Sequence, residues 1–312
     1  MKKAFTLIEL LVVIAIIAIL MGTLLVAGSG STERGRAAKC ATNMRNLAAA
    51  AISYSVGNGG YFPRAQSSLT MKSDTSANGQ GLGYEPVKGW ISFLDTGMSY
   101  PSKSKGAATQ CSFASANPDE ITYALTNGAI WTAIGGNRSS YMCPVFRKAC
   151  QDAGTLDPGW SYQMSAYFGY DNSGVTMSDG IKAFELSRAD RRLLFAEIPC
   201  LDPSSADKKS GSGGKGQNGG SGMSVNLTGG NGTEACDGCL VYKSKGGEET
   251  IGFNHRGNKR VFGHVAFADG HVEQITAPKG GNYVELTDWL CCGLDVVYRN
   301  GEYEEIKNSV EE

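Results

Sequence analysis

The sequence predicts an α+β protein in which a long N-terminal helix packs on an antiparallel, β-rich C-terminal domain with large loop insertions. Three observations support this fold class: an apolar run at the start of the chain, an amphipathic segment that continues it, and a glycine-rich remainder dominated by strand-like runs. The chain has 312 residues and 42 glycines, nearly double the ordinary share of about 7%. This excess predicts many turns and short strands, which argues against an all-helical protein.

The charge balance excludes one class of function. The chain carries 29 basic and 30 acidic side chains, so no overall positive charge attracts phosphates. We therefore expect no nucleic-acid partner. A chain of this length can also bury a full core, so it does not need disulfides or metals merely to be stable.

The apolar run at 5–27 predicts a helix that crosses a membrane. About 23 residues at 1.5 Å each give roughly 34 Å, enough for a hydrocarbon core of about 30 Å. Lys2 and Lys3 precede the run and favour a cytoplasmic N-terminus, although basic residues also follow it at 34–39. We expect a single-pass protein of the inner membrane whose C-terminal domain is periplasmic or on the cell surface.

Glu9 helps to distinguish three kinds of N-terminal segment: a cleaved secretory signal, a plain membrane anchor and a specially processed leader. A carboxylate inside an apolar run costs free energy in lipid, so it needs a partner or a function. A simple signal or anchor gains nothing from Glu9. Residues 26–29 form a weak signal-peptidase site, which keeps the ordinary signal open.

Residues 2–10, KKAFTLIEL, closely resemble the processing site of type IV prepilins and type II secretion pseudopilins. The resemblance implies a leader peptide at 1–4, cleavage by prepilin peptidase between Ala4 and Phe5, and N-methylation of Phe5. Ala4 stands where glycine is more usual, but it is also small. The resemblance further implies that Glu9 pairs with the new amino terminus of a neighbouring pilin or pseudopilin subunit, which removes the cost of two lone charges in lipid.

Residues 28–56 predict an amphipathic continuation of the helix, which the run GNGG at 57–60 then ends because glycine accepts the left-handed cap conformation. In pilin-like folds, the first half of such a helix lies in the membrane or filament core and the second half packs on a sheet. Residues 39–47 and 60–63 also resemble the large, planctomycete-type class of pseudopilin-like proteins. Steps of four and three residues place five side chains on the face that we expect to pack on the body: Cys40, Met44, Leu47, Ala51 and Tyr54.

Residues 57–312 form the expected exported domain. We expect short helices over 145–151 and 181–188, and a flexible surface loop rich in Gly, Ser and Asn over 204–232. The strand-like runs are Ile121–Leu125, Ser161–Tyr170, Arg192–Ile198, Leu240–Tyr242 and Val284–Leu286.

Residues 262–275 predict a β-hairpin in which Asp269 and Gly270 form a two-residue turn. A metal interpretation would use His264, His271 and Glu273 as ligands. Because side chains alternate along a strand, the third ligand depends on a register that the sequence does not reveal, so we favour a structural hairpin.

The same segment resembles a processing-associated motif of the pseudopilin-like class, in which a histidine precedes an Asp-Gly pair by a short fixed spacing. Here His255 is followed by thirteen residues before Asp269 and Gly270, which is longer than that motif requires. The longer spacing weakens the transfer of any role to His255.

No cofactor is expected from the sequence. The acidic turns at 171–174 and 179–180 offer the oxygen ligands that calcium prefers, and some pseudopilins bind calcium in loops. The spacing fits no EF-hand, so turn chemistry is the better interpretation.

Nine cysteines occur, at positions 40, 111, 143, 150, 200, 236, 239, 291 and 292. Export would place them in a compartment that permits disulfides. With Cys40 set aside as a buried helix residue, the other eight allow 105 pairings. We expect structural disulfides in preference to a zinc or redox role for the pair Cys236 and Cys239.

Two functions of different classes remain. The first is a structural subunit of a type II secretion or type IV pilus-like envelope filament, with no catalytic site. The second is a membrane-anchored exported module, for example one that binds polysaccharide. No nucleophile–base grouping or serine elbow is visible, so we expect no enzyme. The positions of the tryptophans distinguish the two functions. If they cluster on an exposed face, they favour a binding module; if they are buried and dispersed, they favour the scaffold. The four are Trp90, Trp131, Trp160 and Trp289.

Overall fold

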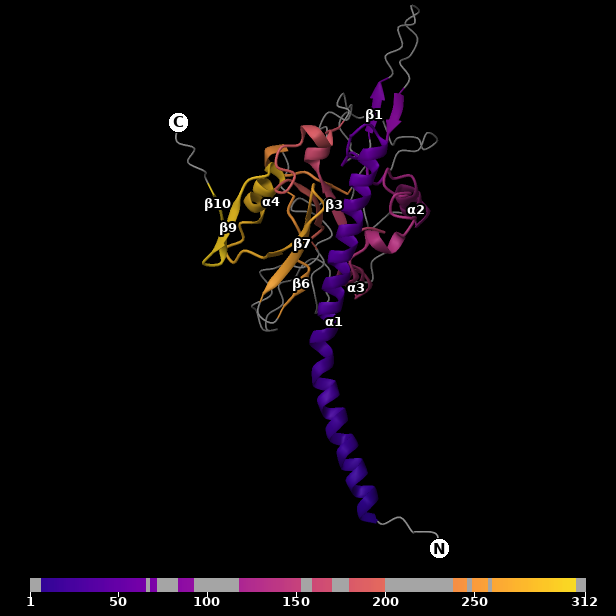
Figure 1. The fold of residues 1–312 in the computed structure, drawn as a ribbon, viewed down its shortest axis with the longest axis vertical. Coiled ribbons are helices and arrows are strands. Elements are labelled where there is room, and N and C mark those ends of the chain that lie inside the picture. The colour runs from indigo at the N-terminus through magenta and orange to yellow at the C-terminus, as the bar shows by residue number, and fades with distance from the viewer. Residues whose placement is uncertain are drawn as a thin grey trace, which may run out of the picture.

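The architecture is α+β, as predicted: a long N-terminal helix stands beside a mixed β-sheet (Figure 1). The computed structural model describes residues 7–65, 68–71, 84–92, 118–152, 159–169, 180–199, 238–245, 249–257 and 260–306. The predicted loop at 204–232, the acidic run at 171–174 and the cysteines at 111, 200 and 236 lie outside these residues.

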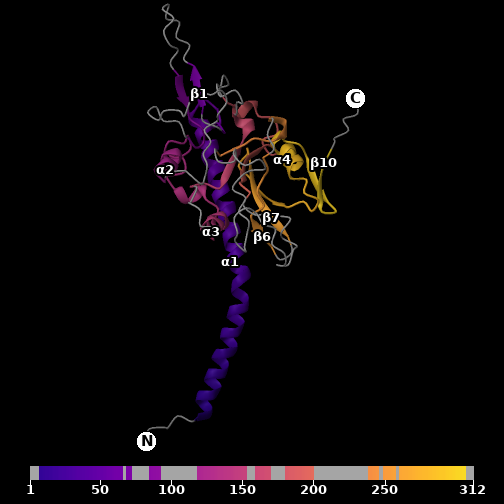
Figure 2. The same cartoon turned by 180° about the vertical axis from the view of Figure 1, so that it is seen from behind.

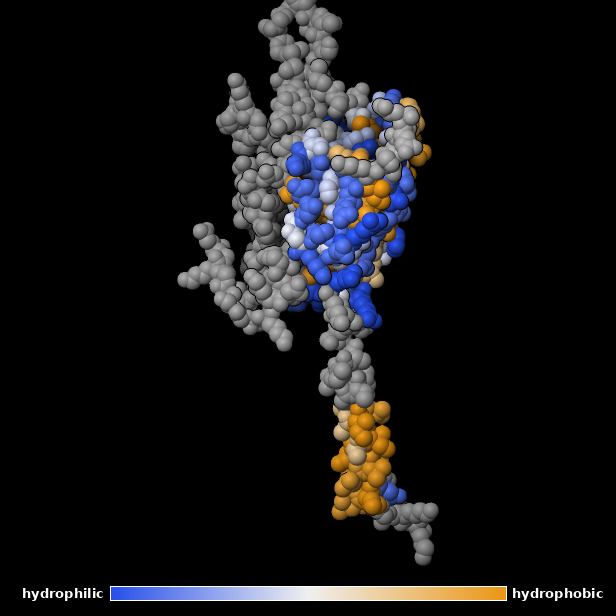
Figure 3. Space-filling model, turned by 90° about the vertical axis from the view of Figure 1, so that its left-hand side faces the viewer, coloured by the Kyte–Doolittle hydropathy of each residue, from blue (hydrophilic) through white to orange (hydrophobic). Residues whose placement is uncertain are grey.

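Helix α1 (Leu7–Gly57) is a single element that contains both predicted helical segments. Its N-terminal half extends away from the body, and its C-terminal half lies along it, as both views show (Figures 1 and 2). From Leu7 to Met21 every side chain is exposed, and these residues form an apolar surface (Figure 3). Within the described part of the chain, no helix is long and apolar enough to cross a membrane.

The predicted inward face of α1 is confirmed. Cys40, Met44, Leu47 and Ala51 are fully buried and Tyr54 is half-buried, because this face packs on the sheet. The helix ends at the predicted glycine run, where Gly59 and Gly60 take positive φ angles of 65° and 88°.

The central sheet has the strand order β5-β3-β4-β7-β6, and β8 pairs with β7. Strand β5 runs parallel to β3, so the sheet is mixed rather than purely antiparallel as predicted. Helix α1 contacts β4, β6, β7 and β8, while α4 lies on the other side of the sheet (Figures 1 and 2). The strands are β3 (Tyr162–Ser165), β4 (Leu193–Glu197), β5 (Cys239–Leu240), β6 (His255–Arg256), β7 (Val261–Phe267) and β8 (Val272–Thr276).

Smaller elements surround this centre. Helices α2 (Pro118–Thr126) and α3 (Pro144–Asp152) lie on the side of α1 away from the sheet (Figure 1). Two further pairs of antiparallel strands stand apart: β1 (Ser68–Met71) with β2 (Tyr84–Val87), and β9 (Val296–Arg299) with β10 (Glu302–Glu305). The short 3-10 helices are η1 (Arg138–Tyr141), η2 (Ala166–Phe168), η3 (Ala183–Glu185) and η6 (Lys243–Lys245).

Two predicted strands are helices. Residues 121–125 lie in α2, which begins at Pro118, a residue well suited to the first helical position. Residues 284–286 lie in α4 (Tyr283–Cys292), which Gly293 ends in the left-handed conformation. The predicted helix over 145–151 is confirmed as α3, whereas within 181–188 only η3 is helical.

The predicted hairpin is formed by β7 and β8, but its connection has three residues rather than two. Ala266 pairs with Val272, and the amide of Phe267 donates to the carbonyl of His271 at 2.9 Å, which leaves residues 268–270 as the loop. Gly270 supplies the positive φ of 94° at the last loop position.

Candidate functional site

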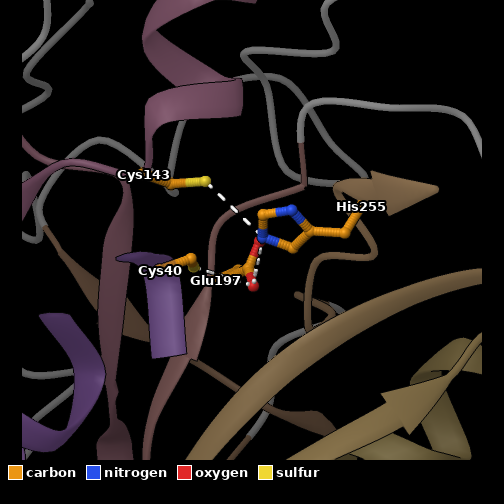
Figure 4. Close-up of side chains that lie close together, drawn as sticks. All are labelled: Cys40, Cys143, Glu197 and His255. Atoms are coloured by element: carbon orange, nitrogen blue, oxygen red, sulfur yellow. Dashed lines mark hydrogen bonds and ion pairs between the residues drawn. The ribbon is translucent and has the colours of Figure 1, made fainter. Parts of the chain in front are cut away.

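Four buried side chains from separate parts of the chain meet between α1 and the sheet: Cys40, Cys143, Glu197 and His255 (Figure 4). All four residues are fully buried. Each offers one atom able to bind a metal ion, and these atoms all lie within 4.8 Å of one another.

Local structure explains why each side chain reaches this point. Cys40 lies on the inward face of α1. Cys143 immediately precedes α3, and its amide donates to the hydroxyl of Ser161 at 2.6 Å. Glu197 ends β4, and His255 opens β6 opposite Phe262, whose ring stacks on the imidazole at 5.5 Å between centroids.

The contacts within the cluster are short. Cys40 Sγ donates to Glu197 Oε1 at 3.1 Å, and His255 Nε2 lies 3.3 Å from the same oxygen. Cys143 Sγ lies 3.7 Å from His255 Nε2. Glu197 Oε2 is buried and makes no hydrogen bond within the described part of the chain. The cluster therefore places one carboxylate, one imidazole and two thiols around a common point.

These groups set the protonation of one another. Burial opposes the charge on Glu197, but the positive charge of His255 and hydrogen bonds from His255 and His264 outweigh it, so the pKa of Glu197 lies well below its usual range. Burial likewise opposes the imidazolium, yet the carboxylate of Glu197 raises the pKa of His255 to about 11. Burial raises the pKa of Cys143, but the hydrogen bonds with Cys40 and His255 outweigh this effect and lower the pKa to about 7.

A second layer of groups orients the cluster. The backbone amide of His264 donates to Glu197 Oε1 at 2.9 Å, and the ring Nδ1 of His264 lies 3.0 Å from the same oxygen. The Tyr162 hydroxyl donates to Cys40 Sγ at 3.4 Å. On the far side of the His255 ring, Nδ1 lies 3.6 Å from Glu33 Oε1. Nε2 is thus the ring nitrogen that faces the cluster.

Of the three residues of the predicted histidine and Asp-Gly motif, only His255 lies in this cluster. Asp269 and Gly270 lie in the hairpin connection, where the Asp269 carboxylate accepts a hydrogen bond from the amide of His271 at 3.0 Å. These two residues position the loop and lie apart from the cluster.

The metal interpretation of the hairpin is not supported. His264 pairs with Gln274 across the strands, while Glu273 pairs with Val265, so the side chains of His264 and Glu273 point to opposite faces. His264 contacts Glu197 instead. His271 is partly exposed and contacts Asp269 and Glu273.

The predicted disulfides are not found among the described cysteines: no disulfide joins Cys40, Cys143, Cys150, Cys239, Cys291 and Cys292. Cys40 and Cys143 belong to the cluster, and Cys291 is buried in α4. Sequence reasoning therefore placed Cys40 correctly as a buried helix residue but missed the roles of Cys143 and Glu197. Neither lies in a local motif that could have indicated them.

The predicted processing residues Ala4 and Phe5 lie outside the described residues. Glu9 lies in the first turn of α1, where it is exposed among apolar side chains. Residues 1–25 match the family model for the prokaryotic N-terminal methylation motif. No curated protein and no solved structure matches the chain. The chain thus carries a leader of the type IV pilin and pseudopilin kind.

Proposed function

We propose that this protein is a non-catalytic structural subunit of a type II secretion or type IV pilus-like envelope filament. The observation that carries the proposal is the methylation motif at residues 1–25, at the head of a helix that is apolar and exposed over Leu7–Met21. An apolar surface of this extent needs a cover, which lipid provides before assembly and neighbouring helices provide in a filament.

The proposed route has three steps. Prepilin peptidase cuts between Ala4 and Phe5 at the inner membrane, and Phe5 becomes N-methylated. The mature chain keeps its N-terminal helix in the membrane, with the body exported. Glu9 then pairs with the amino terminus of a neighbouring subunit, which neutralises both charges in an apolar setting.

The tryptophans favour this scaffold role over a polysaccharide-binding module. Trp90 and Trp160 are fully buried, and Trp131 and Trp289 are half-buried. Trp90 stacks on Tyr141 at 5.8 Å and meets Phe195 edge-on at 5.0 Å, so its ring belongs to the core. These four rings therefore do not form an exposed stacking surface.

Mass spectrometry of the N-terminus tests the processing step, with the protein taken from its native membrane. We expect a mature chain that starts at N-methylated Phe5. An Ala4→Gly variant should be processed as well, since glycine is also small, whereas Ala4→Leu should retain Met1 because the bulky side chain blocks the cut. A wild-type chain starting near Gly28, or one still carrying Met1, would contradict the proposal.

A further inference from the structure

We propose that Cys40, Cys143, Glu197 and His255 form a four-ligand site for a thiolate-binding divalent metal ion such as Zn²⁺, and that the bound ion joins α1 to the sheet. This inference rests on the cluster alone and is independent of the filament role.

The donor set identifies the class of ion. Two thiolates and an imidazole suit borderline-soft Zn²⁺, whereas calcium and magnesium prefer oxygen ligands throughout. A carboxylate completes the set of four that structural zinc sites have. Because all four residues are fully buried, no coordination position is open to a substrate. The site is therefore structural rather than catalytic.

Three of the ligand-atom separations are close to those around a tetrahedral ion, and all of them are within 4.8 Å. Zinc bonds of about 2.3 Å to sulfur and about 2.0–2.1 Å to nitrogen or oxygen place neighbouring ligand atoms about 3.3–3.8 Å apart. The separation of Cys143 Sγ and His255 Nε2 is 3.7 Å, and that of His255 Nε2 and Glu197 Oε1 is 3.3 Å. Cys40 Sγ and Glu197 Oε1, at 3.1 Å, need to separate by only a few tenths of an ångström. Side-chain shifts of about 1 Å or less therefore suffice to bind the ion.

The outer contacts are close to those that metal-binding histidines make. Such a histidine directs its second ring nitrogen at a carboxylate or carbonyl, which fixes the tautomer and leaves the first nitrogen's lone pair for the ion. His255 Nε2 faces the cluster, and Nδ1 lies 3.6 Å from Glu33 Oε1, so Glu33 needs to move a few tenths of an ångström closer to accept a hydrogen bond from it. His264 and Tyr162 hold Glu197 and Cys40 in the same way.

A bound ion also accounts for a costly feature of the core. Glu197 is fully buried, and burying a carboxylate costs free energy that its partners must offset. A divalent cation supplies a partner and offsets most of the negative charge that two thiolates and a carboxylate bring. The ligands come from α1, the start of α3, β4 and β6, so the ion would link the helix directly to the sheet.

The test uses the full-length chain, purified in detergent under reducing conditions, with its metal content measured by mass spectrometry. We expect about one zinc per chain, removal by a chelator with a lower thermal midpoint, and recovery with Zn²⁺ but not with Ca²⁺ or Mg²⁺. Co²⁺ in place of zinc should give the visible absorption of a tetrahedral thiolate site, and X-ray absorption of the zinc form should show two sulfur neighbours.

Variants test the assignment of ligands. Cys143→Ser and His255→Gln should each weaken Zn²⁺ binding by more than about 100-fold, since loss of a ligand should cost more than the 10–100-fold typical of an outer partner. The matched controls Cys291→Ser and His271→Gln change a buried cysteine and a histidine outside the cluster, and they should bind like the wild type. The wild-type measurements remain decisive if a ligand variant fails to fold.

Two results would overturn the proposal. One is a wild-type chain that takes up no zinc or cobalt, including the case in which peptide mapping finds a disulfide between Cys40 and Cys143. The other is binding that survives unchanged in Cys143→Ser and His255→Gln.

Discussion

Gly263 shows how a single residue shapes the site. It lies in β7, where a Cβ atom would overlap the backbone carbonyl oxygen of Gly252. The absence of a side chain lets the segment that contains Gly252 and His255 lie directly against β7. This close approach brings His255 into the cluster.

Gly263→Ala should therefore lower the free energy of unfolding by about 3 kcal/mol, at the upper end of the usual cost of overpacking, because backbone rather than a side chain must move. Urea unfolding followed by the fluorescence of the buried Trp90 and Trp160 measures this change. Gly35→Ala is the control. Gly35 lies in α1, and apart from the helix's own adjacent backbone no atom lies within 4 Å of the point that an alanine methyl group would occupy, so alanine should stabilise the helix by about 0.5–1 kcal/mol. Equal midpoints for the two variants would contradict this account.

At this scale the sequence indicated only part of the site. The helical periodicity identified Cys40 as buried, and a motif resemblance drew attention to His255. Cys143 and Glu197 stand more than 50 residues from each other in the sequence, and no local spacing joins them. The cluster depends on how the strands pair, which short-range patterns do not determine.

Among the elements, α1 and the hairpin of β7 and β8 were predictable because their signals are local. A sustained helical stripe ending in glycines marks the helix, and two strand-like runs around Asp-Gly mark the hairpin. Residues 121–125 and 284–286 were misread as strands because short apolar runs fit either element, and only the flanking Pro118 and Gly293 indicate helices.

The packing of α1 on the sheet predicts that substitutions on its two faces affect stability differently. Met44 is fully buried in the core, whereas the neighbouring Arg45 is exposed. Met44→Ala should lower the free energy of unfolding by about 2–5 kcal/mol, since it removes buried apolar atoms and leaves a cavity. Arg45→Ala should stay within about 0.5 kcal/mol. Urea titration of both variants tests this, and a similar loss in the two would mean that α1 does not pack through the Met44 face.

For the molecule as a whole, the α+β class followed from composition and pattern, but the mixed sheet did not. The parallel pairing of β5 with β3 joins residues more than 70 positions apart, and the strand β5 has only two residues, Cys239 and Leu240. So short a strand has no periodicity to read. Its direction is set by the packing of the body around it.

The filament role predicts that Glu9 matters for assembly and not for the fold of the body. Glu9 lies in the first turn of α1, in the half of the helix that extends away from the body. Glu9→Gln should sharply reduce incorporation into filaments, because the neutral amide cannot neutralise the charged amino terminus of a neighbour, while urea unfolding of the body stays unchanged. Shearing and sedimentation of filaments from cells measures incorporation.

Glu304→Gln, an exposed change in β10, is the matched control and should assemble normally. Normal incorporation of the Glu9→Gln variant would argue against the pairing. A loss of body stability in that variant would instead show that Glu9 acts through the fold.

The continuity of α1 has a mechanical consequence. Its 51 residues make roughly 76 Å of helix at about 1.5 Å each, and the half that packs on the body continues without a break into the half that projects from it. Tension applied to the projecting end would load the contacts from Cys40 to Ala51 in shear, so that they share the force rather than peel apart one after another. A metal crosslink at Cys40, close to the projecting end of this packed segment, would carry a large share of that load.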